Sequence, residues 1–338
     1  MREPVVHLIV GPERHGVVRF GVELQAALEA GGVNIERVRA PDHRAARARA
    51  VRSGQGVHLQ FTDRLFGSDA RQAVVAVGEL AAEVRRGGGR VTATLHDLPQ
   101  PSDGANYGIR ARAYASLVSV LDGVAVSSEH ERTILYDMGV QQRAAVIPLP
   151  IAPPVCGPPA SRLPPSVAVF GFVYPGKGHV EVLDAMADLP SNVRMMAVGE
   201  PSAGHGHLVD ELEVIARAQG RPFTLTGHVS ESALVPLLQS VTVPVVHHRH
   251  VSASGSLNSW ITAGRRPLVP ATRYIGELAE RNPGALWLHD DDRPSLSAAI
   301  RAALDEPSAT WLPPGLVCSP TPAAAAADYG HLLRSVHR

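Results

Sequence analysis

The sequence predicts an α/β protein of two doubly wound domains, in which parallel strands alternate with helices that cover both faces of each sheet. Three observations predict this fold class. The chain has 338 residues, enough for two domains of ordinary size. Short apolar runs alternate with longer amphipathic runs in each half. Between the halves, residues 148–165 contain eight prolines, which helix interiors and central strands do not tolerate.

The composition indicates a globular protein and excludes several classes. Hydrophobic residues make up 45% of the chain, charged residues 19%, and 32 basic residues balance 32 acidic ones. Zero net charge argues against a general nucleic-acid binder. Two distant cysteines, Cys156 and Cys318, suit neither a disulfide scaffold nor a zinc finger. The first residues lack the apolar core of a signal peptide, and no apolar run approaches the ~18 residues of a membrane helix. We therefore expect a cytoplasmic protein.

The first half is expected to form one parallel sheet covered by helices. Ser127 and Ser128 before Glu129 and Glu131 are typical of a helix N-cap with acidic first-turn residues. The expected strands are 5–10, 34–38, 57–61, 91–95, 124–126 and 145–147, and the expected helices are 18–30, 69–86, 109–121 and 129–138. We assign these elements to a domain spanning residues 1–150.

The second half repeats the alternation after a linker at 151–166, and we assign it to a domain spanning residues 167–318. Its expected strands are 167–170, 193–198, 223–225, 241–246, 267–269 and 285–288. Its expected helices are 179–186, 208–219, 231–238, 257–263, 275–281 and 294–304, and one more helix is expected at 322–336. Two such domains would place a ligand cleft between the carboxyl ends of their sheets.

A glycine-rich loop, GFVYPGKG from Gly171 to Gly178, follows an expected strand and contains Lys177, the only lysine in the chain. Glycines there let backbone amides approach a phosphate, and the ammonium supplies a compact positive charge that arginine does not mimic. The pattern also fits a P-loop. A P-loop, however, requires a Ser or Thr after the lysine to bind magnesium, and Gly178 has no hydroxyl. The loop therefore predicts phosphate binding of another kind.

Two loops of the first half lie at the carboxyl ends of expected strands. Residues 11–16, GPERHG, follow the first strand and open a helix whose amides can face an anion. His96 and Asp97 follow the fourth strand, where a histidine can contact a substrate hydroxyl or a charged group. Tight turns need glycine in any case, and Asp97 has the alternative role of capping a turn.

Residues 247–258 form a third candidate, in which a strand ends and a Ser/Gly turn precedes a helix. The amides of Gly255, Ser256 and Leu257 are placed to bind phosphate oxygens. No Asp or Glu occurs from 232 to 276, whereas four arginines do, which favours an anionic ligand. A metal site at His247, His248 and His250 is disfavoured because three such neighbours on an extended segment point in different directions. The run HDDD at 289–292 resembles a metal patch too, but the helix expected directly after it favours acidic residues at a helix start.

Taken together, these segments resemble the GT-B fold glycosyltransferases, in particular the family 4 retaining enzymes that use nucleotide-diphosphate sugars. The segments that carry the resemblance are 11–16, 95–97, 170–178, 226–229, 254–257 and 263–269. The resemblance implies two Rossmann-like domains facing across a cleft, the first binding the acceptor and the second the nucleotide sugar. It also implies that the helix at 322–336 packs back on the first domain.

The resemblance assigns roles to single residues. Lys177 would contact the donor diphosphate, Gly16 would let its loop approach the same phosphates, and His96 would lie beside the transferred sugar. The implied catalytic residues are therefore His96 and Lys177. The implied donor-binding residues are Gly16, Lys177, Gly227, His228, Arg249, Ser254, Gly255, Ser256 and Leu257, and the implied acceptor-side residues are Arg14, His15 and Asp97.

The implied co-substrate is a UDP- or GDP-linked sugar, with no tightly bound cofactor and no metal. The sequence leaves open the acceptor, which is a glycan, a lipid or a small molecule, and the oligomeric state, for which a homodimer is considered.

Three positions depart from the family pattern. The family has an arginine after the glycine that opens the lysine loop, where this chain has Phe172. The family also has two glutamates eight positions apart, and alignment on Pro267 places Ser252 and Trp260 there. Ribose recognition would then use Asn258 or Ser259, or be weaker than in the family. Because both carboxylates are missing, the alternative function is a non-catalytic GT-B protein that binds a sugar nucleotide or serves as a partner subunit. A GT-B epimerase is disfavoured because paired acid/base carboxylates are lacking.

Overall fold

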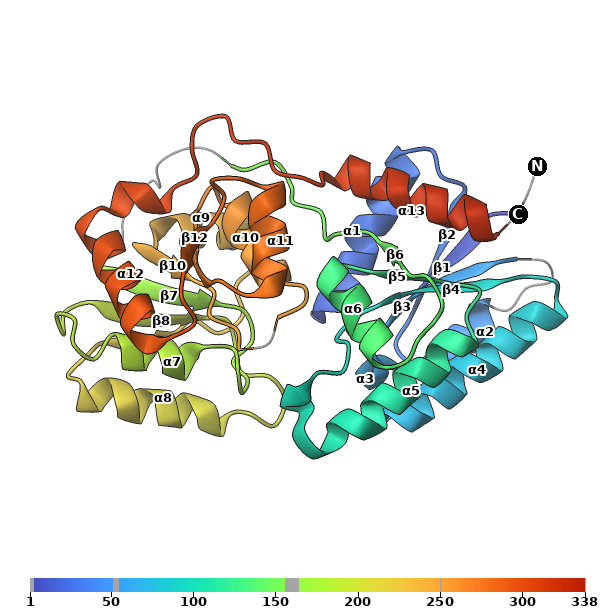
Figure 1. Cartoon of the computed structure of the whole chain (residues 1–338), viewed down its shortest axis with the longest axis horizontal. Coiled ribbons are helices and arrows are strands. Elements are labelled where there is room, and N and C mark those ends of the chain that lie inside the picture. The colour runs from blue at the N-terminus through green and yellow to red at the C-terminus, as the bar shows by residue number, and fades with distance from the viewer. Residues whose placement is uncertain (1–2, 51–54, 156–163, 250, 338) are drawn as a thin grey trace. The chain divides into compact units, whose positions relative to one another are not determined.

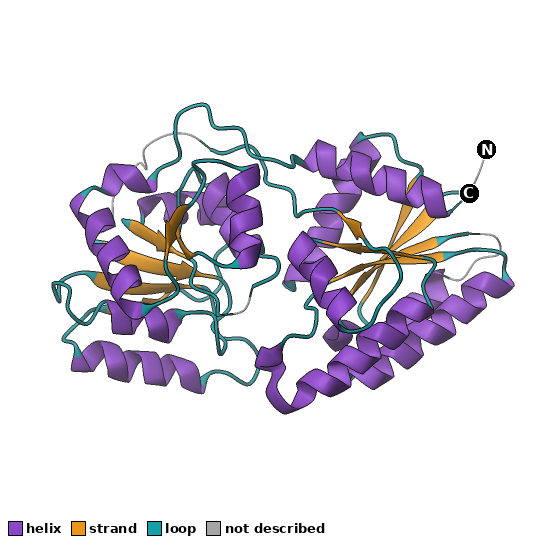
Figure 2. Ribbon diagram, in the orientation of Figure 1, coloured by secondary structure: helices purple, strands orange, loops and turns teal. Residues whose placement is uncertain are grey.

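The computed structural model describes residues 3–50, 55–155, 164–249 and 251–337. The chain divides into two compact units, one of residues 1–150 with 320–338 and one of residues 151–319. Each unit contains a six-stranded parallel sheet with helices on both faces (Figures 1 and 2). The predicted fold class, α/β with two doubly wound domains, is confirmed.

The first unit has strands β1 (Val5–Val10), β2 (Ile35–Ala40), β3 (Val57–Phe61), β4 (Val91–Leu95), β5 (Gly123–Val126) and β6 (Ala145–Val146). Its helices are α1 (Gly16–Ala30), α2 (His43–Ala50), α3 (Asp63–Phe66), α4 (Ala70–Arg86), α5 (Tyr107–Ser119), α6 (Glu129–Asp137) and α13 (Pro322–Val336), and a 3₁₀ helix spans Pro101–Asn106. The strand order is β2-β1-β3-β4-β5-β6. The order reverses between β1 and β3, so the ends of these strands border the crevice of the unit.

The two faces of the first sheet differ in polarity. One face is apolar and packs Leu8, Leu59 and Val91 against α4 and α5. On the other face, the alternate residues of β1, β3 and β4 are polar and buried: His7, His58, Gln60, Thr92 and Thr94. Sequence reasoning assigned no role to this polar layer, although its period of two along expected buried strands is the signal that would have found it.

Helix α13 follows the second unit in sequence but packs within the first unit. Ala325, Ala326 and Tyr329 contact Leu24 and Leu28 of α1 in one hydrophobic cluster, and Figure 1 shows the two helices side by side. The small alanines let the helices approach closely. The bounds of α13 coincide with the expected helix at 322–336.

The second unit has strands β7 (Ser166–Phe170), β8 (Arg194–Val198), β9 (Phe223–Leu225), β10 (Val243–Val245), β11 (Leu268–Pro270) and β12 (Trp287–His289). Its helices are α7 (His179–Ala185), α8 (His207–Ala218), α9 (Glu231–Ser240), α10 (Gly255–Thr262), α11 (Arg273–Arg281) and α12 (Arg293–Asp305), and a short 3₁₀ helix spans Pro307–Thr310. The strand order is β12-β11-β10-β7-β8-β9, the order of dinucleotide-binding sheets. It reverses between β7 and β10.

Of the expected linker at 151–166, residues 156–163 lie outside the described residues. Ile151 is buried in the core of the second unit, the Val155 amide donates to the Thr262 carbonyl over 2.7 Å, and Ser166 opens β7. Cys156 is also outside the described part, whereas Cys318 is buried as a free thiol. No helix in the described ranges has the length and hydropathy needed to cross a bilayer.

Candidate functional site

In open α/β sheets the ligand crevice lies outside the carboxyl ends of the strands at which the strand order reverses. In the second unit these strands are β7 and β10. The loop after β7 carries Lys177, and the segment after β10 leads to the start of α10. These two segments are far apart in sequence. The parallel pairing of β7 with β10 brings them to one edge of the sheet.

Lys177 is buried at this edge, with 5% of its surface exposed. Its ammonium donates to Ser256 Oγ over 2.9 Å and lies 5.8 Å from the centre of the Tyr174 ring. Burial lowers the pKa of Lys177 to about 7. No carboxylate among the described residues forms an ion pair with it. The ammonium is thus desolvated and lacks a neutralising partner within the described chain.

The glycines of the lysine loop are required by close approaches within the protein. A Cβ on Gly171, whose φ is +119°, would lie 2.8 Å from Lys177 Nζ. A Cβ on Gly178, whose φ is +97°, would lie 2.2 Å from the His247 carbonyl oxygen. Any side chain at these positions would displace the ammonium or the β10 segment.

Helix α10 begins at Gly255 with Ser254 as its N-cap. The Ser254 hydroxyl accepts from the Leu257 amide over 3.2 Å. The helix cap thus already uses the Leu257 amide, and the contact of that amide with a phosphate stays a prediction. The amides of Gly255 and Ser256 have no acceptor among the described residues and remain available at the positive end of the helix.

The other basic residues of this region are already engaged. Arg249 is 67% exposed and pairs with Glu181 over 3.0 Å. Arg265 is buried, where it donates to the backbone carbonyls of Leu238, Gln239, Val241, Thr242 and Thr310. The Arg265 guanidinium thus connects several backbone segments. It therefore does not support the prediction, made from the arginines of this region, that an anionic ligand binds here. Gly227 and the exposed His228 follow β9, two strands from the crevice.

Buried histidines surround the lysine loop. His247 stacks on His289 with ring centres 5.5 Å apart, and burial lowers the pKa of His248 and His179, with nearby Lys177 acting in the same direction. No group of three His, Cys, Asp or Glu within the described ranges is placed to hold a metal ion, and His250 lies outside those ranges. In the run HDDD at 289–292, Asp292 caps α12 by accepting from the Ser295 amide, as expected of a helix start.

The three positions that depart from the family pattern differ in their exposure to solvent. Phe172 is partly exposed on the lysine loop. Ser252 is buried after β10. Trp260 is completely buried in the core between the sheet, α9 and α11, so its position does not face a ligand. The outward-facing neighbour is Ser259, whose hydroxyl donates to the Gly255 carbonyl over 3.0 Å.

In the first unit, the loop after β1 opens helix α1. His15 is the N-cap, and its Nδ1 accepts from the Val17 amide over 3.2 Å. Arg14 and Gly16 are exposed, and a Cβ on Gly16 would meet nothing within 4 Å. Gly11, with φ +117°, is the glycine that the fold requires here, since a Cβ would lie 2.6 Å from Leu65.

His96 and Asp97 lie at the end of β4, in the same unit. His96 is 8% exposed and bonds through Nε2 to Gln60 Oε1 over 2.9 Å. Asp97 is exposed and adopts φ +50°, a left-handed conformation that Asp tolerates better than most residues. The backbone carbonyl of His96 accepts from the Tyr114 hydroxyl over 3.0 Å.

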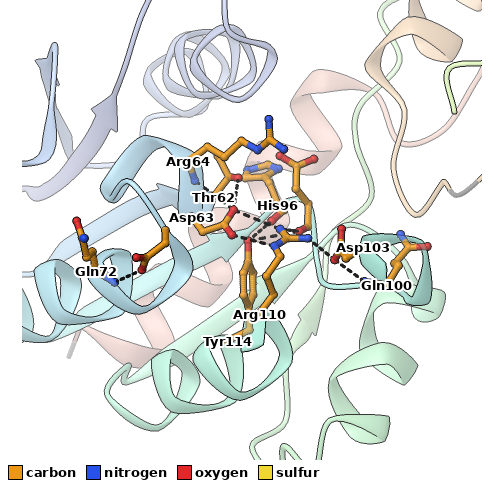
Figure 3. Close-up of polar contacts among 11 residues, drawn as sticks. Thr62, Asp63, Arg64, Gln72, His96, Gln100, Asp103, Arg110 and Tyr114 are labelled. Atoms are coloured by element: carbon orange, nitrogen blue, oxygen red, sulfur yellow. Dashed lines mark hydrogen bonds and ion pairs between the residues drawn. The ribbon is translucent and has the colours of Figure 1, made fainter. Parts of the chain in front are cut away.

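An ion-pair cluster that sequence reasoning missed holds this turn. Arg110 of α5 pairs with Asp63 over 2.9 Å and also with Asp103. It donates to the Asp97 carbonyl over 2.8 Å as well. Figure 3 shows the guanidinium between the two carboxylates, beside Tyr114. These residues come from three segments of the chain, and the sequence alone contains no signal that pairs them.

No protein-family model matches the chain, and neither does any curated protein sequence. Solved structures do match. HepE from Anabaena, solved with UDP and glucose, is 14% identical, with 99% of this chain and 96% of that chain covered and a TM-score of 0.69. Sucrose-phosphate synthase from Thermosynechococcus elongatus is 15% identical, with 100% and 95% covered and a TM-score of 0.68.

A third similar structure is the pneumococcal O-GlcNAc transferase GtfA, solved with UDP and GlcNAc. It is 14% identical, with 86% of this chain and 55% of that chain covered and a TM-score of 0.55. At these identities the likeness shows the fold alone. The fold is GT-B, as the family resemblance implied.

Proposed function

We propose that the protein is a glycosyltransferase that moves a sugar from a nucleotide-diphosphate donor to an acceptor, and that its second unit holds the donor. The observation that carries the proposal is the buried Lys177 ammonium bonded to Ser256 at the reversal of strand order. A desolvated cation without a carboxylate partner is costly, and an anionic ligand would neutralise it. HepE and GtfA were solved with UDP, which supports a nucleoside diphosphate as that anion.

The same geometry supports the chemistry of transfer. When the bond between sugar and diphosphate breaks, negative charge grows on the leaving diphosphate. The Lys177 ammonium and the free amides of Gly255 and Ser256 are held by the fold on one side of the crevice. Donors that are already oriented stabilise the developing charge without reorganisation. Ser254 supports the site indirectly, by capping the helix that presents the amides.

The finer features of the proposal rest on the family resemblance. They are a UDP- or GDP-linked donor, retention of configuration, and an acceptor bound by the first unit near Arg14, His15 and Asp97. His96 is assigned a hydroxyl of the reacting sugars. Donor contacts from Gly16, Gly227, His228 and Arg249 belong to the same proposal.

A panel of UDP-, GDP- and dTDP-linked sugars tests the proposal. We expect one donor class to release its nucleoside diphosphate, through transfer or slow hydrolysis, and Lys177→Ala to abolish the release. Arg293→Ala is the matched control, because it removes a positive charge that pairs with Asp184 and Asp188 on the surface of the same unit. Equal loss in both variants, or retention in Lys177→Ala, would contradict the proposal.

The absence of carboxylates at Ser252 and Trp260 favours a second candidate, a GT-B protein that binds a sugar nucleotide without turnover. The same panel separates the two functions. Donor binding in a thermal-shift assay, without release of the diphosphate from any donor, would support the non-catalytic candidate. A ligand at about 100 times its Kd adds ~2.7 kcal/mol of stability, which such an assay detects.

A further inference from the structure

A continuous chain of hydrogen bonds in the first unit leads from His96 to the surface of α1. His96 Nε2 lies 2.9 Å from Gln60 Oε1, and Gln60 Nε2 lies 2.9 Å from His7 Nε2. His7 Nδ1 lies 2.9 Å from Gln25 Oε1, and Gln25 Nε2 donates to Glu29 Oε1 over 2.8 Å. We call these five residues the relay. It runs from His96, the residue after β4, through Gln60 of β3 and His7 of β1 to Gln25 and Glu29 of α1, on the polar face of the sheet.

The inner members of the relay are neutral and shielded from water. His7, Gln25 and Gln60 are at most 1% exposed. Burial lowers the pKa of His7 and of His96 to about 4, so both rings are uncharged at neutral pH. A neutral imidazole has one N–H donor and one acceptor nitrogen, and a side-chain amide has one donor end and one acceptor end. Each internal side chain of the relay therefore has only two hydrogen-bonding states: it donates toward Glu29 and accepts from the His96 side, or the reverse.

Glu29, at the exposed end of the relay, determines which of these two hydrogen-bonding states is adopted. As a solvent-exposed carboxylate, Glu29 offers only acceptor oxygens. Gln25 must then present its NH₂ to Glu29 and its carbonyl oxygen to the His7 ring. His7 donates through Nδ1, so its Nε2 accepts from the amide of Gln60. The carbonyl oxygen of Gln60 is left for His96, which must donate through Nε2.

We propose that the relay fixes His96 as the Nε2–H tautomer and thereby makes its Nδ1 a hydrogen-bond acceptor for a hydroxyl of the bound sugar substrate. Among the described residues the only hydrogen bond of the His96 ring is the one through Nε2, so Nδ1 has no protein partner there. A lone pair there attracts hydroxyl or ammonium donors and repels the oxygens of a phosphate. Gln60, His7, Gln25 and Glu29 are positioning residues in this scheme. The tautomer follows from the hydrogen bonds alone, whereas the sugar hydroxyl rests on the proposed function.

Long-range ¹H–¹⁵N NMR of the labelled full-length protein tests the tautomer directly. We expect the His96 Nε2 to show the shift of a protonated nitrogen and Nδ1 that of a bare one. Glu29→Gln gives the surface end both a donor and an acceptor, so both donor–acceptor directions of the relay become possible. His96 then samples both tautomers, and the ¹⁵N shifts of its two ring nitrogens move toward each other. Glu79→Gln, which removes the same charge from the surface of α4, should leave them unchanged.

The kinetic effect of Glu29→Gln is expected to be small and specific. If half of the molecules adopt the other tautomer, kcat/KM falls by about twofold, in proportion to the competent fraction. A wild-type His96 protonated on Nδ1, or unchanged shifts in Glu29→Gln, would overturn the relay. The predicted tautomer in a protein that turns over no donor would support the relay and contradict only the proposed transferase function.

Discussion

The Lys177 ammonium donates to the Ser256 hydroxyl over 2.9 Å, which joins the loop after β7 to the first turn of α10. Ser256 Oγ also lies 3.3 Å from the hydroxyl of Ser254, the N-cap of that helix. The only lysine of the chain is thus held against a helix N-terminus, whose positive end raises the cost of an additional cation. Such an arrangement stabilises a bound anion and destabilises the empty protein.

Lys177→Met should therefore raise the stability of the unliganded protein and lower its affinity for a nucleoside diphosphate. It removes a buried charge while keeping the aliphatic stem, so we expect the unliganded protein to gain about 1–3 kcal/mol at pH 7. Nucleoside diphosphate affinity should fall by about 2–4 kcal/mol. Lys177→Arg should also bind poorly, because the planar guanidinium is larger than the space against Gly171. Chemical denaturation and calorimetry measure the two effects, and a destabilised Lys177→Met protein would contradict this account.

The pKa of Lys177 near 7 predicts a pH dependence of binding. A diphosphate favours the charged ammonium, so binding should take up a proton, and affinity should decrease as the pH rises from 6.5 to 9. Calorimetry in buffers of different ionisation enthalpy measures the uptake. Lys177→Met should show neither the uptake nor this pH dependence.

The same group contributes to stability with a defined sign. Its pKa is lower in the folded state than the ordinary value of 10.5, so between pH 7 and 10.5 the unfolded chain binds more protons. Its contribution to the free energy of unfolding therefore rises with pH across this interval. Denaturation of wild type and Lys177→Met at pH 7 and pH 9 isolates this contribution. We expect the difference in free energy of unfolding between the two proteins to be smaller at pH 9 than at pH 7, and an unchanged difference would count against it.

Gly171→Ala should weaken diphosphate binding while the fold persists. At φ +119° an alanine costs about 1–3 kcal/mol, and its Cβ would push the ammonium away from Ser256. Gly206→Ala is the control, because its φ of −55° suits any residue and nothing lies within 4 Å of its Cβ. Calorimetry should show reduced affinity in Gly171→Ala alone. Wild-type affinity in that variant would remove the loop from the site.

The phosphates should dominate affinity for the nucleotide. In the proposed donor complex, Lys177 and two helix amides contact the diphosphate. No carboxylate stands at Ser252 or Trp260 to bind the ribose hydroxyls, whose charge-assisted hydrogen bonds to a carboxylate contribute ~1.5–3 kcal/mol each. We expect nucleoside diphosphate to bind far better than the monophosphate and the nucleoside, with affinity falling as salt increases. Calorimetry with the three ligands checks this order, and equal affinities would favour a nucleoside-dominated site.

Arg110→Gln should destabilise the first unit and loosen the His96–Asp97 turn. It leaves Asp63 and Asp103 without their common partner and removes the bond to the Asp97 carbonyl. We expect a loss of about 2–3 kcal/mol, part of which the double variant with Asp63→Asn recovers. Denaturant unfolding measures it. Arg112→Gln, on the exposed side of the same helix, should have little effect.

Strongly patterned elements were predictable from the sequence because local composition determines them. The strands β1, β3 and β4 have the predicted bounds, since buried parallel strands appear as short apolar runs between turns. Helix α2 was missed because HRAARARA contains no apolar residue larger than alanine, although Ala46 is buried in the core. Asp42 supports the start of this helix by accepting from two amides. Shifts of one or two residues at other ends reflect caps that a pattern does not specify.

Lys177 could be proposed as a site residue from the sequence alone, because one lysine among 32 basic residues in a glycine loop is a local signal. What that lysine touches could not be found there. The Ser256 bond, the use of the Leu257 amide by its cap and the burial of Trp260 depend on how β7, β10 and their helices pack. The relay from Glu29 to His96 depends on the pairing of β1, β3 and β4. Contacts between residues distant in sequence arise only once strands pair and helices cover them, and for that reason the tertiary structure decided them.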